Sequence, residues 1–554
     1  MLTEIERKEI AELLFPNTKD TEEYIKQYPK RNLPEGSEVT RFAPSPTGFV
    51  HMGSIYTSMI SKKIANQSKG IFMLRIEDTD KSREIENGVE QISNSLEKYN
   101  LVPDEGILPN GEVKGEYGPY MQSQRLDIYR SFAKKLVLGG KAYPCFMSPD
   151  ELGALRKKQE ELGTRIGCYG EYAKGREAKL EDIKKELDNG KAFVIRLKSS
   201  GDFNKKFNFK DLIKGSVTFP ENDFDSVLLK SDGYPVYHFA HPIDDYLMGT
   251  TIITRGDEWL SSVPLHKELY KVLGWEMPKY AHISPLMKID EETGNKRKLS
   301  KRKDPEANAS YYIEKGYPIK GIMEYLLNIA NSNFYDWRLQ NPDKDTSNFD
   351  FKLEKIHKSG ALFDFVKFEN VCKDIVSKMS AKEVYNLALE WSREFNEDVC
   401  EKLTENKEYC LSILNIERGE GKIRKDISKM GDIKKQLEIF FDDTFEELKC
   451  PELKTDSKDI LKRYLEVFDI SDTSQEWFNK IKQVAEEFKY ATDRKDFENN
   501  PNKYKGKVGD IAMTIRIAIT KKTRTPDLYQ IMQVLGEEKV RERIVNFISN
   551  NQYT

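Results

Sequence analysis

The sequence has few cysteines and no long hydrophobic run. No stretch of about 18 uncharged apolar residues occurs, and residues 1–10 carry charges where a secretory signal needs an apolar core. We therefore expect a cytoplasmic protein with no membrane partner. The six cysteines of 554 residues form neither a CxxC pair nor a dense framework, so we expect reduced thiols.

The sequence also lacks an excess of charge of one sign. It has 89 Lys and Arg against 92 Asp and Glu, a formal net charge of −3. This balance excludes a histone-like protein, and any nucleic acid must be bound by local basic patches. With 38% hydrophobic residues, 28 Phe and 27 Tyr, the chain can bury several cores. Its length predicts about three to five domains.

The N-terminal half predicts a parallel sheet. Residues 1–37 carry a polar helical pattern that ends in a breaker-rich link, and we treat them as an extension. The pattern then predicts a strand at 39–43, a turn at 44–48, a helix at 54–68 and a strand at 71–77. This βαβ order predicts a doubly wound α/β sheet.

An insertion and a helical half follow. Polar helices and β character near 193–197 interrupt the α/β rhythm from about 126 to 224. Further strands are predicted at 227–229, 237–240, 251–255 and 282–284, with a helix at 264–273. After about residue 335 strand signals vanish and amphipathic helical patterns continue.

The turn after the first predicted strand carries a His-x-Gly pattern. Ligands of α/β sheets sit at the carboxyl ends of strands, and a helix that begins near Gly53 directs its free N–H groups toward an anion there. His51 can donate a hydrogen bond to a phosphate oxygen, and Gly53 leaves room for a flat base. Taken alone, His-x-Gly at a helix start is a weak signal, and His51 is then more typical of a structural histidine.

A basic stretch near the end of the α/β half supplies the second part of a nucleotide site. Residues 296–303 carry six cations in eight positions. Lys298 and Lys301 flank Ser300, an arrangement that can neutralise charge on a transferring triphosphate. A solvated basic loop is the alternative interpretation.

These two patterns resemble the paired signatures of class I aminoacyl-tRNA synthetases: residues 51–54 read HMGS and residues 298–302 read KLSKR. The segments RFAPSPTG (41–48), LRIEDTD (74–80), GPYMQS (118–123) and DGYPVY (232–237) narrow the resemblance to the bacterial glutamyl-tRNA synthetase family. Residues 510–518 and 526–536 resemble the end of that family's anticodon-binding region, so the resemblance covers roughly 38–554.

The resemblance implies a two-step ligase reaction. Glutamate attacks the α-phosphorus of ATP to give glutamyl-adenylate, and the terminal ribose of tRNA then takes the acyl group, with Mg²⁺ sharing the phosphate charge. The implied catalytic residues are His51, Gly53, Lys298, Ser300 and Lys301. The implied ATP-binding residues are His51, Gly53, Ser54, Glu258, Trp259, Lys298 and Lys301. Trp259 is as readily a core residue.

The resemblance also implies a glutamate pocket, formed by Arg41, Ala43, Ser45, Glu77, Tyr237, His241 and Arg255. Two arginines suit two carboxylates and Glu77 suits the ammonium, although Arg41 and Glu77 could be a structural ion pair. His241 stands where the family usually has asparagine. A protonated imidazole there would favour a carboxylate; a neutral imidazole that donates a hydrogen bond is the alternative.

The implied fold class is α/β: a Rossmann-type class I synthetase catalytic domain with an inserted α+β domain, followed by an all-α anticodon-binding half. The expected segments are an extension (1–37), the first catalytic half (38–125), the acceptor-stem-binding insertion (126–224), the second catalytic half with the KLSKR loop (225–335), a helical stem-contact region (336–400) and the anticodon-binding region (401–554). Some relatives carry zinc in the insertion. Here Met147 stands two residues after Cys145, where a second cysteine would be needed, and only Tyr169 follows Cys168, so we predict no zinc.

The implied partners are tRNA(Glu), glutamate and ATP, for a protein that we expect to be a monomer. Charging of tRNA(Gln) as well is an open alternative, and a catalytically inactive tRNA-binding homologue is another. The all-helical second half argues against a glutaminyl-tRNA synthetase, whose tail is built of β-barrels. Basic stretches at 422–425 and 521–524 are candidates for tRNA contact; the sequence does not identify the anticodon readers.

Overall fold

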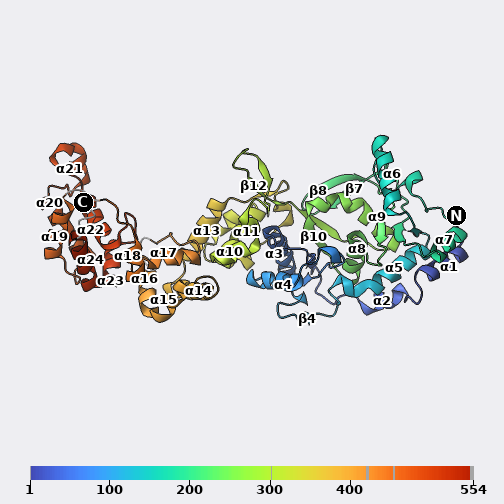
Figure 1. Ribbon diagram of the computed structural model, residues 1–554, viewed down its shortest axis with the longest axis horizontal. Coiled ribbons are helices and arrows are strands. Elements are labelled where there is room, and N and C mark those ends of the chain that lie inside the picture. Colours follow the sequence, from blue (N-terminus) through green and yellow to red (C-terminus); the bar gives the residue numbers. More distant parts are fainter. Residues whose placement is uncertain (1, 301, 420–422, 453–455, 550–554) are drawn as a thin grey trace. The chain divides into compact units, whose positions relative to one another are not determined.

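A computed structural model describes residues 2–300, 302–419, 423–452 and 456–549. The chain forms two compact units (Figure 1). Unit 1 comprises Met1–Tyr312 and Met323–Asp364, and unit 2 comprises Ile313–Ile322 and Phe365–Thr554.

The predicted parallel sheet is present in unit 1. Strands β1 (Val39–Phe42), β2 (Ile71–Leu74) and β3 (Glu105–Ile107) pair in parallel, and β4 (Val113–Lys114) adds an antiparallel edge. Strands β10 (Ile252–Gly256) and β11 (Lys279–Ile283) also pair in parallel. β10 lies beside β1, where the Thr251 N–H donates to the Val39 carbonyl at 2.9 Å. The strands lie in the order β3-β2-β1-β10-β11, so the chain adds strands first on one side of β1 and later on the other. Doubly wound folds bind ligands at such a switch point.

The crossover helix α3 (Met52–Gln67) connects β1 to β2. Its apolar face, which includes Ile55, Ile60 and Ile64, is buried against the sheet. The helix ends in a tight return to β2 at Gly70, where a Cβ atom would lie 1.9 Å from the Glu38 carbonyl oxygen, so only glycine fits. α3 therefore starts at the carboxyl end of β1.

Two strand predictions need correction. The strand predicted at 237–240 is wrong: these residues begin helix α8 (Tyr237–Leu247), whose buried Phe239, Ala240, Ile243 and Leu247 follow a helical spacing that four residues are too few to reveal. The strand at 227–229 forms as β9 (Val227–Leu229). It pairs antiparallel with β6 (Val194–Leu197) rather than joining the parallel sheet.

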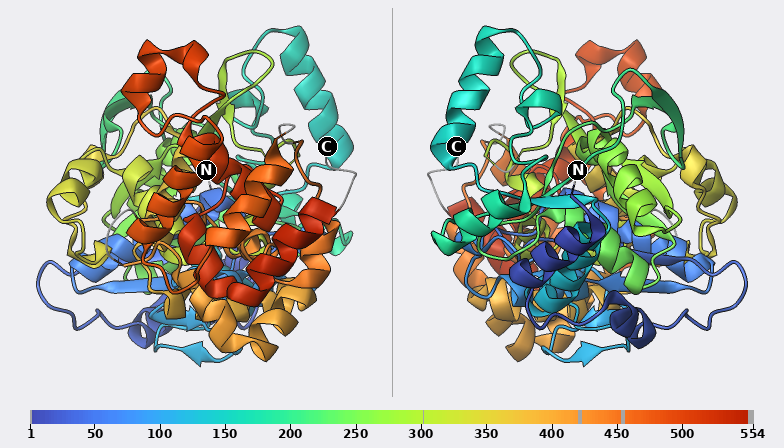
Figure 2. Two further views of the ribbon diagram at one scale, coloured as in Figure 1. Left: turned by 90° about the vertical axis from the view of Figure 1, so that its left-hand side faces the viewer. Right: turned by 90° about the vertical axis from the view of Figure 1, so that its right-hand side faces the viewer.

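Residues 126–224, predicted to be an inserted segment, contribute to a small sheet, a hairpin and helices. Strand β5 (Ala142–Cys145) completes the antiparallel sheet β5-β6-β9. Helix α6 (Pro149–Glu161) projects from the rest of unit 1 in both views of Figure 2. Helix α7 (Leu180–Asp188) precedes β6, and β7 (Lys206–Asp211) forms a hairpin with β8 (Gly215–Pro220).

The N-terminal extension packs against unit 1. Ile10 of α1 (Glu4–Leu14), its C-cap residue Phe15, and Tyr24 of α2 (Thr21–Gln27) belong to a core shared with α5 (Leu126–Leu138). After α2, the Arg31 guanidinium donates to both carboxylate oxygens of Glu105 at 2.7 and 2.8 Å and to the Met248 carbonyl at 2.7 Å. The extension is thus fastened beside the edge of the parallel sheet.

The remaining elements of unit 1 surround this framework. They are α4 (Gly88–Lys98), α9 (Val263–Leu273), α12 (Phe334–Gln340) and the strands β12 (Leu286–Ile289), β13 (Lys296–Lys298) and β14 (Ala361–Leu362). Helices α10 (Ala309–Lys315) and α11 (Ile319–Ala330) include the residues at which the chain passes between the units.

Unit 2 is helical, as predicted, although the range predicted to be helical from about residue 335 also contains strand β14 of unit 1. Its helices are α13 (Phe365–Ser377), α14 (Ala381–Phe395), α15 (Glu397–Glu405), α16 (Lys407–Asn415), α17 (Ile433–Leu437), α18 (Asp442–Glu447), α19 (Ser457–Val467), α20 (Ser474–Glu487), α21 (Arg494–Asn499), α22 (Val508–Thr520), α23 (Leu528–Leu535) and α24 (Glu537–Ser549). They enclose two apolar cores, one around Ile413 and one around Ile515. Across the described parts of the chain, no helix is both long and apolar enough to span a bilayer.

The Arg31 anchor yields a stability prediction. We expect Arg31→Ala to lower the free energy of unfolding of unit 1 by about 2 kcal/mol, because it removes a bidentate ion pair whose Arg31 and Glu105 side chains are only 7% and 13% exposed. Chemical denaturation followed by tryptophan fluorescence measures the change. Arg83→Ala, which breaks an exposed pair with Asp80, is the control with an expected change below about 0.5 kcal/mol. Equal effects of the two variants would contradict the anchoring role.

Candidate active site

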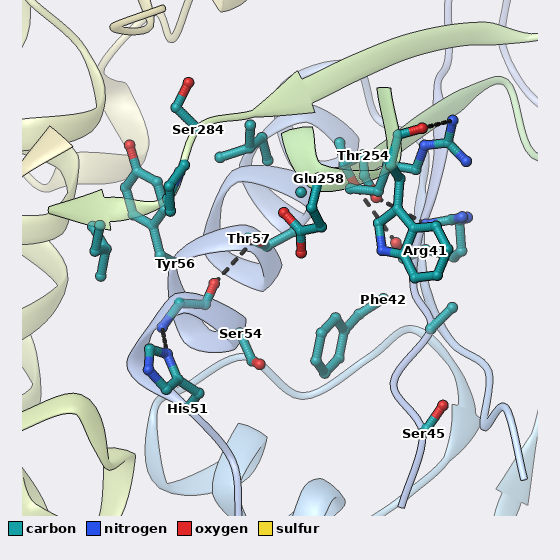
Figure 3. A pocket seen from close by; sticks show the side chains of 18 of the residues that line it. Arg41, Phe42, Ser45, His51, Ser54, Tyr56, Thr57, Thr254, Glu258 and Ser284 are labelled. Atoms are coloured by element: carbon teal, nitrogen blue, oxygen red, sulfur yellow. Dashed lines mark hydrogen bonds between the residues drawn. The ribbon is translucent and has the colours of Figure 1, made fainter. Parts of the chain in front are cut away.

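A cavity of about 420 Å³ opens at the carboxyl ends of β1 and β10. Figure 3 shows Arg41, Ser45, His51, Ser54 and Glu258 arranged around it. Among the residues predicted from the sequence, the lining includes Arg41, Ala43, Ser45, His51, Gly53, Ser54, Glu77, Tyr237, Arg255, Glu258, Trp259 and Lys298. The structure therefore brings together segments that lie far apart in the sequence, from Arg41 to Lys298.

His51 caps helix α3 at one end of this cavity. Its Nδ1 atom accepts a hydrogen bond from the Gly53 N–H at 2.9 Å, which Figure 3 shows. Because Nδ1 accepts, the proton of a neutral ring lies on Nε2, where it can be donated to an anion. The N-terminus of α3 adds backbone N–H groups and the positive end of the helix dipole. This corner of the cavity suits a phosphate group.

The basic loop supplies Lys298 to the same cavity. Lys298 ends strand β13, which pairs antiparallel with β12. Behind it Asp304 accepts from Arg297 at 2.6 and 2.8 Å and from the Ser300 N–H at 2.9 Å. These contacts with Arg297 hold the pKa of Asp304 far below its usual value. Ser300 shapes the loop and does not line the cavity, and the predicted Lys301 lies outside the described residues.

Arg41 lies on the floor of the cavity and is 3% exposed. Its Nε lies 3.2 Å from Asp245 Oδ1, and its Nη1 donates to the Thr254 carbonyl at 2.9 Å. Glu77 instead pairs with Arg75 at 3.2 Å. The alternative of a structural Arg41–Glu77 ion pair therefore does not describe this arrangement. Burial raises the pKa of Glu77 although Arg75 and Arg41 oppose the shift.

Arg255 is held by four neighbours. Its Nε donates to His282 Nε2 at 2.9 Å, and Nη1 lies 3.1 Å from His266 Nδ1. Nη1 also donates to the Tyr237 hydroxyl at 3.2 Å, and Nη2 donates to the Trp259 carbonyl at 3.1 Å. All four acceptors are neutral when the histidines are, so none of these four contacts compensates the charge of the guanidinium.

His241 lies behind the cavity rather than in its lining. The ring stacks on Tyr237 with centroids 5.4 Å apart, and Nε2 lies 3.1 Å from the Tyr280 hydroxyl. Its Nδ1 is 2.5 Å from Asp245 Oδ2, at an angle that does not align a hydrogen bond. Burial lowers the pKa of His241 to about 3, which outweighs the attraction of Asp245. Burial therefore favours the neutral imidazole over the protonated one.

Several residues at the site were missed in the sequence. Asp244 and Asp245 on α8, together with Arg75, form the buried ionic layer beneath Arg41. Adjacent aspartates within the apolar pattern of residues 239–247 were an available signal, because paired carboxylates in a buried helix need cations. Thr57 and Ser284, which line the cavity, carried no such signal.

The cysteines of the insertion are both buried. Within residues 2–300, 302–419, 423–452 and 456–549, no three His, Cys, Asp or Glu side chains gather in a way that could hold a metal ion. The absence of zinc remains a prediction from the ligand spacing.

The comparisons with known proteins agree with this geometry. Residues 38–359 match the family described as tRNA synthetases class I (E and Q), catalytic domain, and residues 383–548 match the anticodon binding domain. The fold and the site thus define a class I aminoacyl-tRNA synthetase. Within that class, the chain belongs to the glutamate–tRNA ligase family, as the following relatives show.

The chain is 47% identical to the glutamate–tRNA ligase of Clostridium perfringens (strain 13 / Type A) over 97% of this chain and 99% of that protein. It is 46% identical to the one of Acetivibrio thermocellus over 97% and 99%. A crystal structure of a glutamate tRNA ligase from Elizabethkingia meningosepticum in complex with its amino acid superposes with a TM-score of 0.73 at 26% identity, covering 94% of this chain and 100% of that one.

The buried histidines predict acid sensitivity. Burial lowers the pKa of His238 to about 4 and of His241 to about 3, and it also lowers the pKa of His266 and His282. Below the unfolded-state value of about 6.5, the unfolded chain binds protons that the native chain excludes, so stability falls as pH falls. Each such histidine contributes up to about 1.4 kcal/mol per pH unit.

We expect His241→Asn to flatten the pH dependence of the unfolding midpoint between pH 7 and pH 5, measured by thermal denaturation. Exposed His357→Asn is the matched control and leaves the slope unchanged. A slope that His241→Asn leaves as steep as that of the unaltered protein would contradict the neutral buried imidazole.

Proposed function

We propose that this protein attaches L-glutamate to tRNA(Glu) in two steps, through a glutamyl-adenylate. The observation that carries the proposal is one cavity that joins a phosphate-binding helix turn at His51 to a pair of arginines, Arg41 and Arg255. The cations Arg41, Arg255 and Lys298 in one lining suit a reaction that needs charge neutralisation and positioning.

The proposed roles follow from the position of each side chain. His51 Nε2 and the N-terminus of α3 bind triphosphate oxygens, as does Lys298, and Ser300 and Lys301 belong to the same loop. Gly53 and Ser54 line the same part of the cavity and border the nucleotide. A side chain at position 53 would crowd His51, because a Cβ there would lie 3.1 Å from His51 Nδ1. Glu258 and Trp259 line the wall proposed to hold the adenosine; Trp259 is 38% exposed, which makes it available to a ligand.

Glutamate occupies the opposite end in this proposal. Arg41 and Arg255 bind its two carboxylates, and Glu77 accepts from its ammonium group. Ser45 and Tyr237 contribute hydroxyl groups, while Ala43 borders the pocket. His241 acts from behind by packing against Tyr237, not by contact with glutamate.

ATP brings Mg²⁺ in this proposal. Since the described residues hold no cluster of three acidic, histidine or cysteine side chains, Mg²⁺ would be held mainly by phosphate oxygens and water. It would neutralise the charge of the leaving pyrophosphate.

The proposed tRNA contact in unit 2 is a cavity of about 590 Å³. Its lining includes Arg424, Lys425, Lys435, Lys522 and Arg524, so it contains parts of both basic stretches predicted from the sequence; Lys422 lies outside the described residues. These cations can contact tRNA phosphates. We further propose a cytoplasmic monomer.

The decisive measurement is attachment of labelled glutamate to purified tRNA(Glu) and tRNA(Gln) in separate assays with ATP and Mg²⁺. Charging of tRNA(Glu) is expected, and His51→Ala should lower kcat at least about 100-fold because it removes a phosphate donor and the cap of α3. Additional charging of tRNA(Gln) would assign the broader activity, whereas failure to charge either tRNA would favour an inactive tRNA-binding homologue.

The Asp304 contact gives a second prediction. Asp304→Asn should raise KM for ATP and lower kcat, together about tenfold in kcat/KM, because a neutral amide no longer fixes Arg297 and the Ser300 N–H behind Lys298. Asp290→Asn is the control: Asp290 binds Arg297 at 2.8 Å and does not contact Ser300. Identical kinetics for the two variants would exclude a special role of Asp304 in the loop.

A further inference from the structure

One carboxylate of the hairpin β7–β8, that of Asp211, is linked through His282 to Arg255 in the proposed glutamate pocket. Asp211 ends strand β7, and its side chain is 2% exposed. Oδ1 accepts from the N–H groups of Ile213 and Lys214 at 2.9 and 2.7 Å and so builds the turn of the hairpin. Oδ2 lies 2.7 Å from His282 Nδ1 and 3.2 Å from the His282 N–H.

His282 in turn lies between Asp211 and Arg255. Because His282 and Arg255 are Cα partners in the parallel strands β10 and β11, their side chains emerge on the same face of the sheet. Arg255 has only donors, so His282 Nε2 must accept its Nε–H, and the ring proton must lie on Nδ1. Asp211 is the acceptor for that proton. His282 is completely buried.

We propose that Asp211 is a positioning residue for glutamate recognition, which it serves by fixing His282 in the Nδ1–H form that can accept a hydrogen bond from Arg255. This inference rests on the proposed role of Arg255 as a ligand of a glutamate carboxylate. Asp211 is not among the residues that line the cavity. It acts through His282, as the orienting carboxylate of a carboxylate–histidine pair does.

The geometry explains why the connection uses a neutral imidazole. A carboxylate placed directly on Arg255 would neutralise its charge and compete with the substrate. A neutral nitrogen fixes the same N–H without that competition. Burial lowers the pKa of His282, which keeps the ring neutral, although the hydrogen bond with Asp211 opposes the shift.

Asp211→Asn is the sharpest test, because it keeps the shape and the Oδ1 turn contacts while it replaces Oδ2, the acceptor facing His282, with an N–H₂ donor. The ring proton then moves to Nε2, where it faces the Arg255 Nε–H, donor against donor. In aminoacylation of tRNA(Glu), we expect KM for glutamate to rise about tenfold or more while KM for ATP changes less than about threefold.

Two substitutions of His282 separate hydrogen bonding from packing. His282→Phe keeps an aromatic ring but offers no acceptor, so it should raise KM for glutamate as Asp211→Asn does. His282→Gln can donate to Asp211 and accept from Arg255, and it should restore KM to within about threefold of the unaltered protein. Exposed His357→Phe is the matched control. Equal values of KM for His282→Gln and His282→Phe would overturn the proposal.

A readout independent of activity is the ring ¹⁵N spectrum of histidine-labelled protein, which contains six histidines. The His282 signals, assigned by their loss in His282→Gln, should show a protonated Nδ1 and a bare Nε2 in the unaltered protein. Asp211→Asn should reverse them. An unchanged tautomer in Asp211→Asn overturns the proposal even if that variant is unstable in the assay.

Arg255→Gln separates this inference from the proposed function. If it leaves KM for glutamate unchanged, the assignment of Arg255 to the substrate fails and the inference fails with it. If Arg255→Gln raises KM but Asp211→Asn and His282→Phe do not, the proposed function stands and the positioning role of Asp211 is wrong.

Discussion

The buried ion network beneath the cavity is the constraint on which the arrangement of unit 1 depends. Asp244 and Asp245, both 0% exposed on α8, face three arginines that are at most 3% exposed: Arg41 from β1, Arg75 just after β2, and Arg125 before α5. Buried charges are stable only when they are paired with good geometry, so no one of these elements can shift without exposing a charge to an apolar interior. The network fixes α8 against the sheet and places Tyr237 at the cavity.

The same network explains why the two arginines of the proposed glutamate pocket differ. Asp245 takes one edge of Arg41, so part of that charge is already compensated before any ligand binds. Arg255 is held by the rings of His266 and His282, by a hydroxyl group and by a carbonyl oxygen, and its charge is available to an anion. A dicarboxylate substrate thus meets one preorganised but shared cation and one unshared cation, an asymmetry that can orient it in the pocket.

Local patterns allowed much of this fold to be predicted. The β1–α3–β2 unit, the His-x-Gly turn and the change to helices in the second half depend on short-range periodicity and turn chemistry. The start of α8 was wrongly predicted as a strand because Tyr237 to Ala240 show no helical period over four residues. β9 was predicted as a strand, yet its antiparallel partner β6 is a long-range property. The burial of His241 likewise depends on Tyr280 and Asp245, which no local pattern associates with it.

The insertion contributes more than a surface to unit 1. Its hairpin turn is closed by the same Asp211 carboxylate that accepts from His282, and Lys214 in that turn donates to Asp257 at 2.8 Å and to the Lys358 carbonyl at 2.7 Å. A segment inserted into a doubly wound fold could have been joined to it only at its two ends. Here its turn is tied to β11, to the residues after β10 and to the segment before β14. Displacement of the hairpin would therefore affect Arg255. If the Asp211 carboxylate moved away from His282, the ring proton could move to Nε2, and His282 would no longer accept the hydrogen bond from Arg255.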